Sequence, residues 1–300
     1  MKRLVLGILV FLLSFASNAQ ADDWMESLSF AKRLARSQNK PILMVWEEAT
    51  EYPLPVLIRN ANGRNVVIDN LFESLELNRV IWEYFVPLKL NEQLYEDIYN
   101  DIKDTRSQSY IDKFNSDALK VMDANGNIIG TSGAFVELLN FSKFLFKYNL
   151  DLTYVKDEAF SYHTKKDFYS SFYLASKYID YSILVNKNVR SEILKLADIY
   201  FDEALTFLNA IEDEGKKSQL QRLNLTKLKE DLIRNKPRRV LRQLKKFEDE
   251  EIDMVNKPLV SFLYYTTYRL LNEKENFEAL ESEISSLNLK QAQLIVNLNQ

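Results

Sequence analysis

The spacing of apolar residues changes part-way along the chain, and this change limits the possible folds more than any other feature. Residues 24–149 alternate between short apolar runs typical of buried strands and amphipathic stretches with helical spacing. From residue 164 onward the helical spacing persists almost to the end. We therefore expect an α/β domain followed by an all-α domain built from helical hairpins.

The first half combines strand pairs of two kinds. The apolar runs PILMVW at 41–46 and VPLKLN at 86–91 are typical of strands covered on both faces, and a helical segment at 73–85 lies between them. A strand–helix–strand unit predicts a parallel pair with a right-handed crossover. The stretches 54–70 and 117–130 each hold two β-rich runs around an Asn-Gly turn, which predicts an antiparallel hairpin. We expect one mixed sheet, with helices on both faces and the first hairpin inserted.

Helical spacing accounts for the rest of this half. It predicts amphipathic helices at 24–40 and 136–148. The stretch 95–115 is polar, and its pattern predicts a helix at its start followed by irregular chain. For the helix at 73–85 the predicted apolar stripe consists of Leu75, Val80, Ile81 and Phe85.

Three stretches of this half resemble the thioredoxin-like superfamily, particularly its exported bacterial members. FAKRLARSQNKPILMVW at 30–46 is similar to the opening helix, Lys-Pro pair and buried strand of that family. NRVIWEYFVPLKLN at 78–91 is similar to the helix and strand after its active-site helix. ALKVMDANGNII at 118–129 is similar to its closing hairpin, with Asp123 and Gly126 in the usual turn positions. The resemblance covers about residues 24–149 and implies a thioredoxin-like fold.

The same alignment implies that the activity of the family is missing. Its Cys-Gly-Pro-Cys motif falls on Glu51, Tyr52, Pro53 and Leu54, where only the proline matches. The position of its cis-proline falls on Asp117. Because the chain contains no cysteine, thiol–disulfide exchange and Cys-ligated zinc are both excluded. The resemblance therefore carries over a fold whose active-site positions are degenerate.

The loop that replaces the motif is acidic, and two interpretations of it remain open. Its carboxylates, with one residue opposite them, provide the oxygen ligands that a hard cation or a hydrolytic mechanism would use. The alternative is a solvated acidic loop. The acidic residues concerned are Glu47, Glu48, Glu51 and Asp117. Trp46 and Tyr52 could form an aromatic binding surface, or pack beneath the inserted hairpin.

The second half consists of paired short helices. The fragments YFDEAL at 200–205 and NFEAL at 276–280 resemble parts of the tetratricopeptide pattern. The alternatives are therefore a tetratricopeptide-like array of helical hairpins and a plain helical bundle. Two helices, at 171–181 and 261–271, are rich in tyrosine and phenylalanine, which favours either a core or a half-exposed binding face. The basic run at 236–246 is interpreted as a solvated helix face beside the acidic stretch 248–253.

The first residues have the pattern of a secretory signal peptide. Lys2 and Arg3 precede an apolar run at 4–16, and small residues follow it. Because this run has 13 residues and a bilayer span needs about 18 or more, we expect cleavage rather than a retained anchor. The predicted organisation is a signal peptide at 1–21, a thioredoxin-like domain at 22–150 and an α-helical domain at 151–300. We expect an exported protein, periplasmic or extracellular, with no membrane insertion after cleavage.

Charge and composition narrow the functional classes further. The net charge of −4 becomes −6 once Lys2 and Arg3 are removed, so we expect no nucleic-acid partner. The single histidine, His163, excludes any site that needs two. No cofactor and no metal are expected, and no catalytic residue stands out. The sequence predicts a redox-inactive, thioredoxin-like protein that acts by protein binding or scaffolding in the cell envelope. The alternative is a hydrolytic or metal-binding enzyme that uses Glu51 and Asp117.

Overall fold

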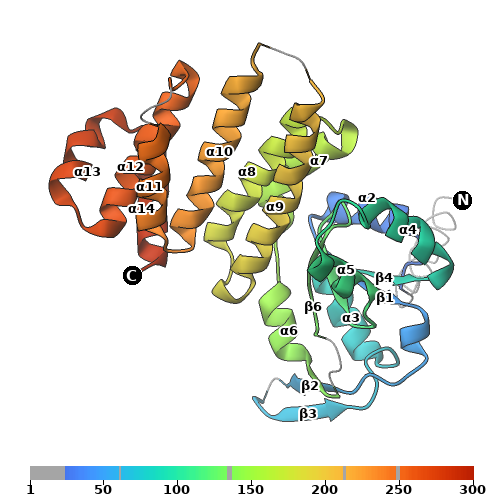
Figure 1. The fold of residues 1–300 in the computed structure, drawn as a ribbon. Coiled ribbons are helices and arrows are strands. Elements are labelled where there is room, and N and C mark those ends of the chain that lie inside the picture. The colour runs from blue at the N-terminus through green and yellow to red at the C-terminus, as the bar shows by residue number, and fades with distance from the viewer. Residues whose placement is uncertain (1–23, 61, 134–136, 212–213, 248–250) are drawn as a thin grey trace, which may run out of the picture. The chain divides into compact units, whose positions relative to one another are not determined.

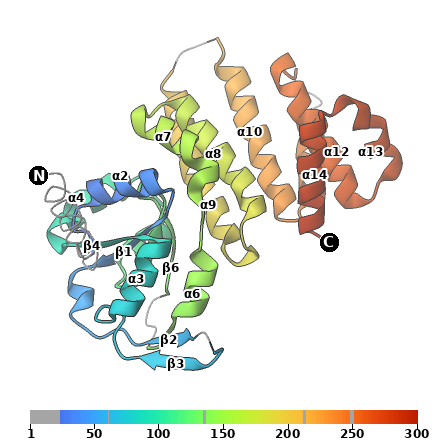
Figure 2. The same ribbon diagram turned by 180° about the vertical axis from the view of Figure 1, so that it is seen from behind.

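The computed structural model describes residues 24–60, 62–133, 137–211, 214–247 and 251–300. The predicted signal peptide lies outside these residues. The chain divides into two compact units, the first ending at Leu152 and the second starting at Thr153. The first unit is mixed α/β and the second is all-helical, as the change in periodicity predicts (Figure 1). The same elements are seen from behind in Figure 2.

A four-stranded mixed sheet forms the core of the first unit, in the order β4-β1-β5-β6. Strand β1 (Ile42–Trp46) pairs in parallel with β4 (Val86–Leu90) and antiparallel with β5 (Lys120–Met122). Strand β6 (Ile128–Thr131) then pairs antiparallel with β5. Every residue of β1 is buried, which explains its unbroken apolar sequence. The predicted parallel pair and closing hairpin are both confirmed.

The inserted hairpin belongs to a second sheet, which corrects the expectation of a single sheet. Strands β2 (Val56–Arg59) and β3 (Asn65–Ile68) form the predicted antiparallel pair. The short strand β7 (Leu139–Asn140) pairs in parallel with β2 and completes the order β3-β2-β7. Because β7 has only two residues, it carries no alternation that sequence analysis could detect. It holds the hairpin against the segment that leads into the last helix of the unit.

Five helices complete the first unit, and two of them correct the predictions. They are α2 (Leu28–Gln38), α3 (Leu75–Tyr84), α4 (Tyr95–Ile102), α5 (Gln108–Asn115) and α6 (Phe141–Tyr148). The segment predicted to be irregular forms α5, because the side chain of Ser107 caps its first turn and Tyr110, Ile111 and Phe114 are buried. On α3 the predicted stripe is wrong at Leu75, which is 54% exposed. The buried face of α3 consists of Leu77, Asn78 and Ile81.

The second unit is a succession of helices, coloured from green to red in Figure 1. They are α7 (Lys156–Thr164), α8 (Phe168–Leu184), α9 (Lys187–Asn209), α10 (Lys216–Ile233), α11 (Pro237–Phe247), α12 (Lys257–Leu271), α13 (Lys274–Leu280) and α14 (Ser286–Leu298). Asparagines in the left-handed conformation follow the ends of two of these helices: Asn235 after α10 and Asn272 after α12. From α7 to α13 each helix packs on the next along the chain, α14 packs on α12, and α10 also packs on α8 and α12. Short 3-10 turns lie at Glu48–Thr50, Glu92–Leu94, Leu152–Val155, Met254–Asn256 and Glu281–Glu283.

The tyrosine-rich helices mainly supply core. Tyr178 on α8 is fully buried and stacks on Tyr200 of α9, with ring centroids 5.7 Å apart. Tyr265 on α12 is also buried, whereas Tyr173 remains exposed. Much of the aromatic content therefore stabilises helix packing. Tyr173 stacks on the exposed Tyr169 of the same helix, with ring centroids 6.3 Å apart, so part of this content lies at the surface. Among the described residues, no helix is both long enough and apolar enough to cross a bilayer.

Candidate functional site

A cavity of about 630 Å³ in the first unit collects most of the residues at the degenerate motif positions. Tyr52, Pro53 and Leu54 line it from the loop after β1, and Asp117 lines it from the loop between α5 and β5. The two segments that the thioredoxin-like alignment places opposite each other therefore border one cavity. The other lining residues are Ala49, Phe72, Asp112, Asn115, Ser116, Ala118, Leu119, Ser132, Gly133 and Leu139.

The wall of this cavity is apolar and its rim is polar. Leu119 and Leu139 are buried, and Leu54 and Phe72 are half-buried. Tyr52 stands at the surface with 74% of its area exposed. Asp112 and Asn115 at the end of α5, and Ser116, Asp117 and Ser132 from the loops flanking β5 and β6, supply hydrogen-bonding groups to the lining. An apolar hollow with a few polar groups at its edge is the usual form of a binding site.

Backbone hydrogen bonds fix the loop that carries the degenerate motif. The amide of Leu54 donates to Asn70 Oδ1 at 3.3 Å, and the amide of Leu71 donates to the carbonyl of Leu54 at 2.9 Å. Asn70 and Leu71 follow the inserted hairpin, so both ends of the insertion are joined here. The inserted hairpin thus holds Leu54 at the cavity wall. It also separates this loop from the next helix along the chain, α3.

A buried lysine lies beneath the opposite loop. The ammonium of Lys120 donates to the carbonyl oxygens of Ser116 and Ala118, the latter at 3.1 Å. It also lies 5.7 Å from the centre of the Trp46 ring. Burial lowers the pKa of Lys120 to about 7, and the nearby carboxylate of Asp117 opposes this change. Lys120 therefore ties together the loop before β5 that contains Asp117. No cis peptide bond occurs among the described residues.

Trp46 does not share a surface with Tyr52. Its side chain is 4% exposed, and its indole nitrogen donates to the carbonyl of Phe114 at 3.0 Å. Its ring packs against Tyr95 and Phe114. The aromatic surface considered from the sequence is therefore limited to Tyr52, and Trp46 belongs to the core.

The loop glutamates do not converge on the cavity. Glu47 accepts a hydrogen bond from Asn91 Nδ2 at 2.6 Å and lies 3.7 Å from the ammonium of Lys89. Glu48 and Glu51 are exposed, and none of the three lines the cavity. Within the described residues, no group of three histidine, aspartate or glutamate side chains is placed to hold a metal ion. The geometry thus gives no support to a carboxylate centre formed with Asp117.

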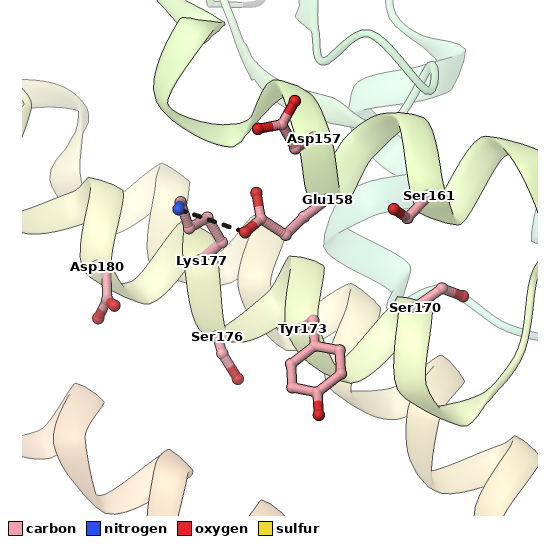
Figure 3. A pocket seen from close by; sticks show the side chains of 8 residues that line it. All are labelled: Asp157, Glu158, Ser161, Ser170, Tyr173, Ser176, Lys177 and Asp180. Atoms are coloured by element: carbon pink, nitrogen blue, oxygen red, sulfur yellow. Dashed lines mark ion pairs between the residues drawn. The ribbon is translucent and has the colours of Figure 1, made fainter.

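A second cavity, of about 340 Å³, lies between α7 and α8 of the helical unit (Figure 3). Figure 3 shows Glu158 of α7 facing Lys177 of α8, and their charged atoms are 3.3 Å apart. Asp180 forms an ion pair with Lys229 of α10. Lys177 also lies 4.6 Å from the centre of the Tyr154 ring. These charges join three helices, which indicates a structural role. The remaining lining residues are Asp157, Ser161, Ser170, Tyr173 and Ser176.

A third cavity, of about 310 Å³, lies between α9, α10 and α11 and is lined almost entirely by charged residues. Burial raises the pKa of Asp198 to about 6, and the neighbouring Glu230 adds to the effect. Arg234 pairs with Glu230 at 2.5 Å, and Arg239 pairs with Asp231 at 3.2 Å. The charged side chains that line this cavity are thus largely paired with opposite charges within the helical unit.

Sequence reasoning missed several residues that build the first cavity. Phe72, Leu119 and Leu139 come from three separate segments, and only the tertiary fold brings them together. Lys120 did leave a signal, because a lysine interrupts the apolar stretch ALKVM of a predicted buried strand. A scan against protein-family models, a search of curated proteins and a search of solved structures find no match to this chain.

Proposed function

We propose that the first unit is a thioredoxin-like domain that binds extended polypeptide segments in its cavity without redox chemistry. One observation carries the proposal: Tyr52, Pro53, Leu54 and Asp117 line one cavity of about 630 Å³ with an apolar wall. The parallel pair β1–β4 and the closing hairpin β5–β6 support the thioredoxin-like assignment. The protein would then serve as a binding or scaffolding factor, in keeping with the predicted export to the cell envelope.

The chemistry of the cavity suits a polypeptide with a large apolar side chain. Leu54, Phe72 and Leu139 offer an apolar wall, where burying one such side chain stabilises a complex by about 1.5–3 kcal/mol. Ser132 Oγ accepts from the amide of Leu119, so its own proton can be donated to a peptide carbonyl, and Ser116 Oγ donates to the carbonyl of Lys113 but can still accept from a peptide amide. An exposed tyrosine beside an apolar pocket is typical of binding hot spots.

The helical unit is proposed to extend the binding role. Its consecutive helix pairs resemble tetratricopeptide-like hairpins, which bury a core between neighbours and leave a face for a partner. In this proposal the first unit holds a polypeptide segment and the helical unit supplies a second protein contact. Neither role requires a cofactor.

The proposal is tested with a probe that is permanently unfolded and has no free thiol. Reduced, carboxymethylated α-lactalbumin carrying fluorescein is titrated with the full chain, and binding is followed by fluorescence anisotropy. Tyr52→Ser should weaken binding by about fivefold or more, because it removes one exposed aromatic ring from the rim. Leu54→Asp should weaken it further, because it places a charge on the apolar wall.

Phe146→Ser is the matched control, since Phe146 is similarly exposed at 67% in the same unit but does not line the cavity. It should leave the affinity unchanged. Thermal melts establish that each variant is folded. Equal affinities for the wild type, Tyr52→Ser and Leu54→Asp proteins would refute the cavity as the binding site.

A further inference from the structure

Helix α11 presents a face of positive charge that the proposed binding cavity does not use. Its exposed basic side chains are Arg238, Arg239, Arg242, Lys245 and Lys246. At 100° per residue, these five positions fall within an arc of about 120° around the helix axis. They extend along the helix for about 12 Å, at 1.5 Å per residue.

The opposite face of α11 is anchored in the unit. Val240 and Leu244 are fully buried, and α11 packs on α10 and α12. This packing fixes which side of the helix faces the solvent. The basic residues are therefore held as a row on one fixed surface.

Most of these charges have no partner within the described residues. Arg239 lies 3.2 Å from Asp231, but no ion pair or hydrogen bond involves the side chains of Arg238, Arg242, Lys245 or Lys246 there. Arg238 and Arg242, like Arg242 and Lys246, are four positions apart, where like charges destabilise a helix. A row of this kind in a chain of net charge −4 provides strong local charge complementarity for an anionic partner.

We propose that this basic face of α11 binds an acidic polypeptide segment. Three of its residues are arginines, whose planar guanidinium groups match the geometry of carboxylates. The row is about as long as two turns of a partner helix or a short extended strand. An anionic surface larger than this row would also approach the rest of the chain, whose net negative charge would repel it.

Two other anionic partners fit the surface less well. Single-stranded nucleic acids are held by aromatic side chains that stack on bases, and no aromatic residue lies among the basic residues of this face. Helices that bind membranes insert an apolar face, but the apolar face of α11 is buried against α10 and α12. The observations therefore favour the acidic polypeptide.

The test uses a fluorescein-labelled peptide with glutamates at every fourth position, and a second peptide with glutamine in their place. Anisotropy titrations with the full chain should show binding of the glutamate peptide that weakens as salt rises, and no binding of the glutamine peptide. The triple variant Arg238→Glu, Arg242→Glu, Lys245→Glu should weaken binding by about tenfold or more.

A matched control variant distinguishes the effect of the basic face of α11 from the effect of the net charge of the chain. Lys156, Lys195 and Lys290 are exposed lysines on α7, α9 and α14, and replacing all three with glutamate changes the net charge by the same amount. This control should stay within about twofold of the wild type. An equal loss in both triple variants, or no binding of the glutamate peptide at low salt, would overturn the proposal. Tighter binding to phosphatidylglycerol vesicles or to duplex DNA than to the peptide would also overturn it.

Discussion

At the scale of single residues, the environment of Lys120 in the first unit is unusual for a lysine. Its side chain is fully buried, yet its ammonium donates to the carbonyls of Ser116 and Ala118. Burial disfavours the charged form, and these hydrogen bonds together with Asp117 favour it. The loop at the cavity edge is therefore held by a group whose charge changes near neutral pH.

This environment gives a pH-dependent stability of defined sign. The pKa of Lys120 is lowered to about 7 in the folded state, against 10.5 for an ordinary lysine. Between these values the unfolded chain holds a proton that the folded chain has released, so folding becomes more favourable as pH rises. Relative to Lys120→Met, the wild type should gain up to about 1.4 kcal/mol per pH unit from pH 7 to 9.

Urea denaturation of both proteins at several pH values measures this difference. Exposed Lys195, changed to methionine, serves as the control for the loss of a surface lysine. If the stability difference between Lys120→Met and the wild type is constant from pH 7 to 9, the ammonium of Lys120 keeps its proton, which contradicts the lowered pKa.

The positions of the candidate site residues were predictable where the thioredoxin-like alignment or the order of elements along the chain determines them. Tyr52, Pro53 and Leu54 follow β1, and Asp117 precedes β5. These residues lie at one cavity because β1 and β5 are antiparallel neighbours in the sheet, so the end of β1 lies beside the start of β5. The environment of Trp46 was not predictable, since the buried partner of its indole, the carbonyl of Phe114, belongs to a distant helix. Exposure depends on tertiary partners that spacing along the sequence does not reveal.

At the scale of elements, helix α8 depends on a capping box at its first turn. The side chain of Asp167 accepts a hydrogen bond from the amide of Ser170 at 2.9 Å, and the amide of Asp167 donates to Ser170 Oγ at 3.1 Å. Asp167→Ala should lower the free energy of unfolding by about 1 kcal/mol, because the first turn loses its acceptor.

Asp167→Asn separates the cap from the exposed ion pair with Lys165. Asparagine keeps the acceptor oxygen but loses the charge, so this variant should stay close to the wild type. Thermal or urea denaturation of the wild type, Asp167→Ala and Asp167→Asn proteins measures these differences in stability. Equal destabilisation by alanine and asparagine would show that the ion pair, rather than the cap, stabilises the helix end.

The elements with strong patterns were predicted, and those without were missed. Strands β1 and β4 and both hairpins follow from apolar runs and Asn-Gly turns. Helix α5 was missed because the polar stretch before it masks the short apolar face of Tyr110, Ile111 and Phe114. Strand β7 is too short to show a period, and it is the element that creates the second sheet.

At the scale of the whole molecule, the first unit should fold without the second. Its last residues contribute to its core: Leu150 and Leu152 are buried, and the amide of Leu152 donates to the carbonyl of Asn39 at 2.9 Å. A fragment from Asp22 through Leu152 should therefore melt cooperatively. A fragment ending at Asn149 should be less stable by roughly 3–6 kcal/mol at most, because it loses two buried leucines.

Circular dichroism melts of the two fragments measure this directly. The chain divides between Leu152 and Thr153, close to the boundary at 150 that the change in periodicity predicts. A fragment through Leu152 with no cooperative transition would mean that the first unit is not an independent domain. Identical melting of both fragments would mean that the two leucines contribute nothing to it.

The central claim is that the protein binds polypeptide segments at the cavity of the first unit. Hydrogen exchange of the full chain, with and without carboxymethylated α-lactalbumin, tests it most directly because the readout is local. Slower exchange is expected at the amides of Tyr52, Leu54 and residues 116–119 when the probe is bound, with no such change in the Leu54→Asp variant. Protection confined to the helical unit, with none at these two loops, would contradict it.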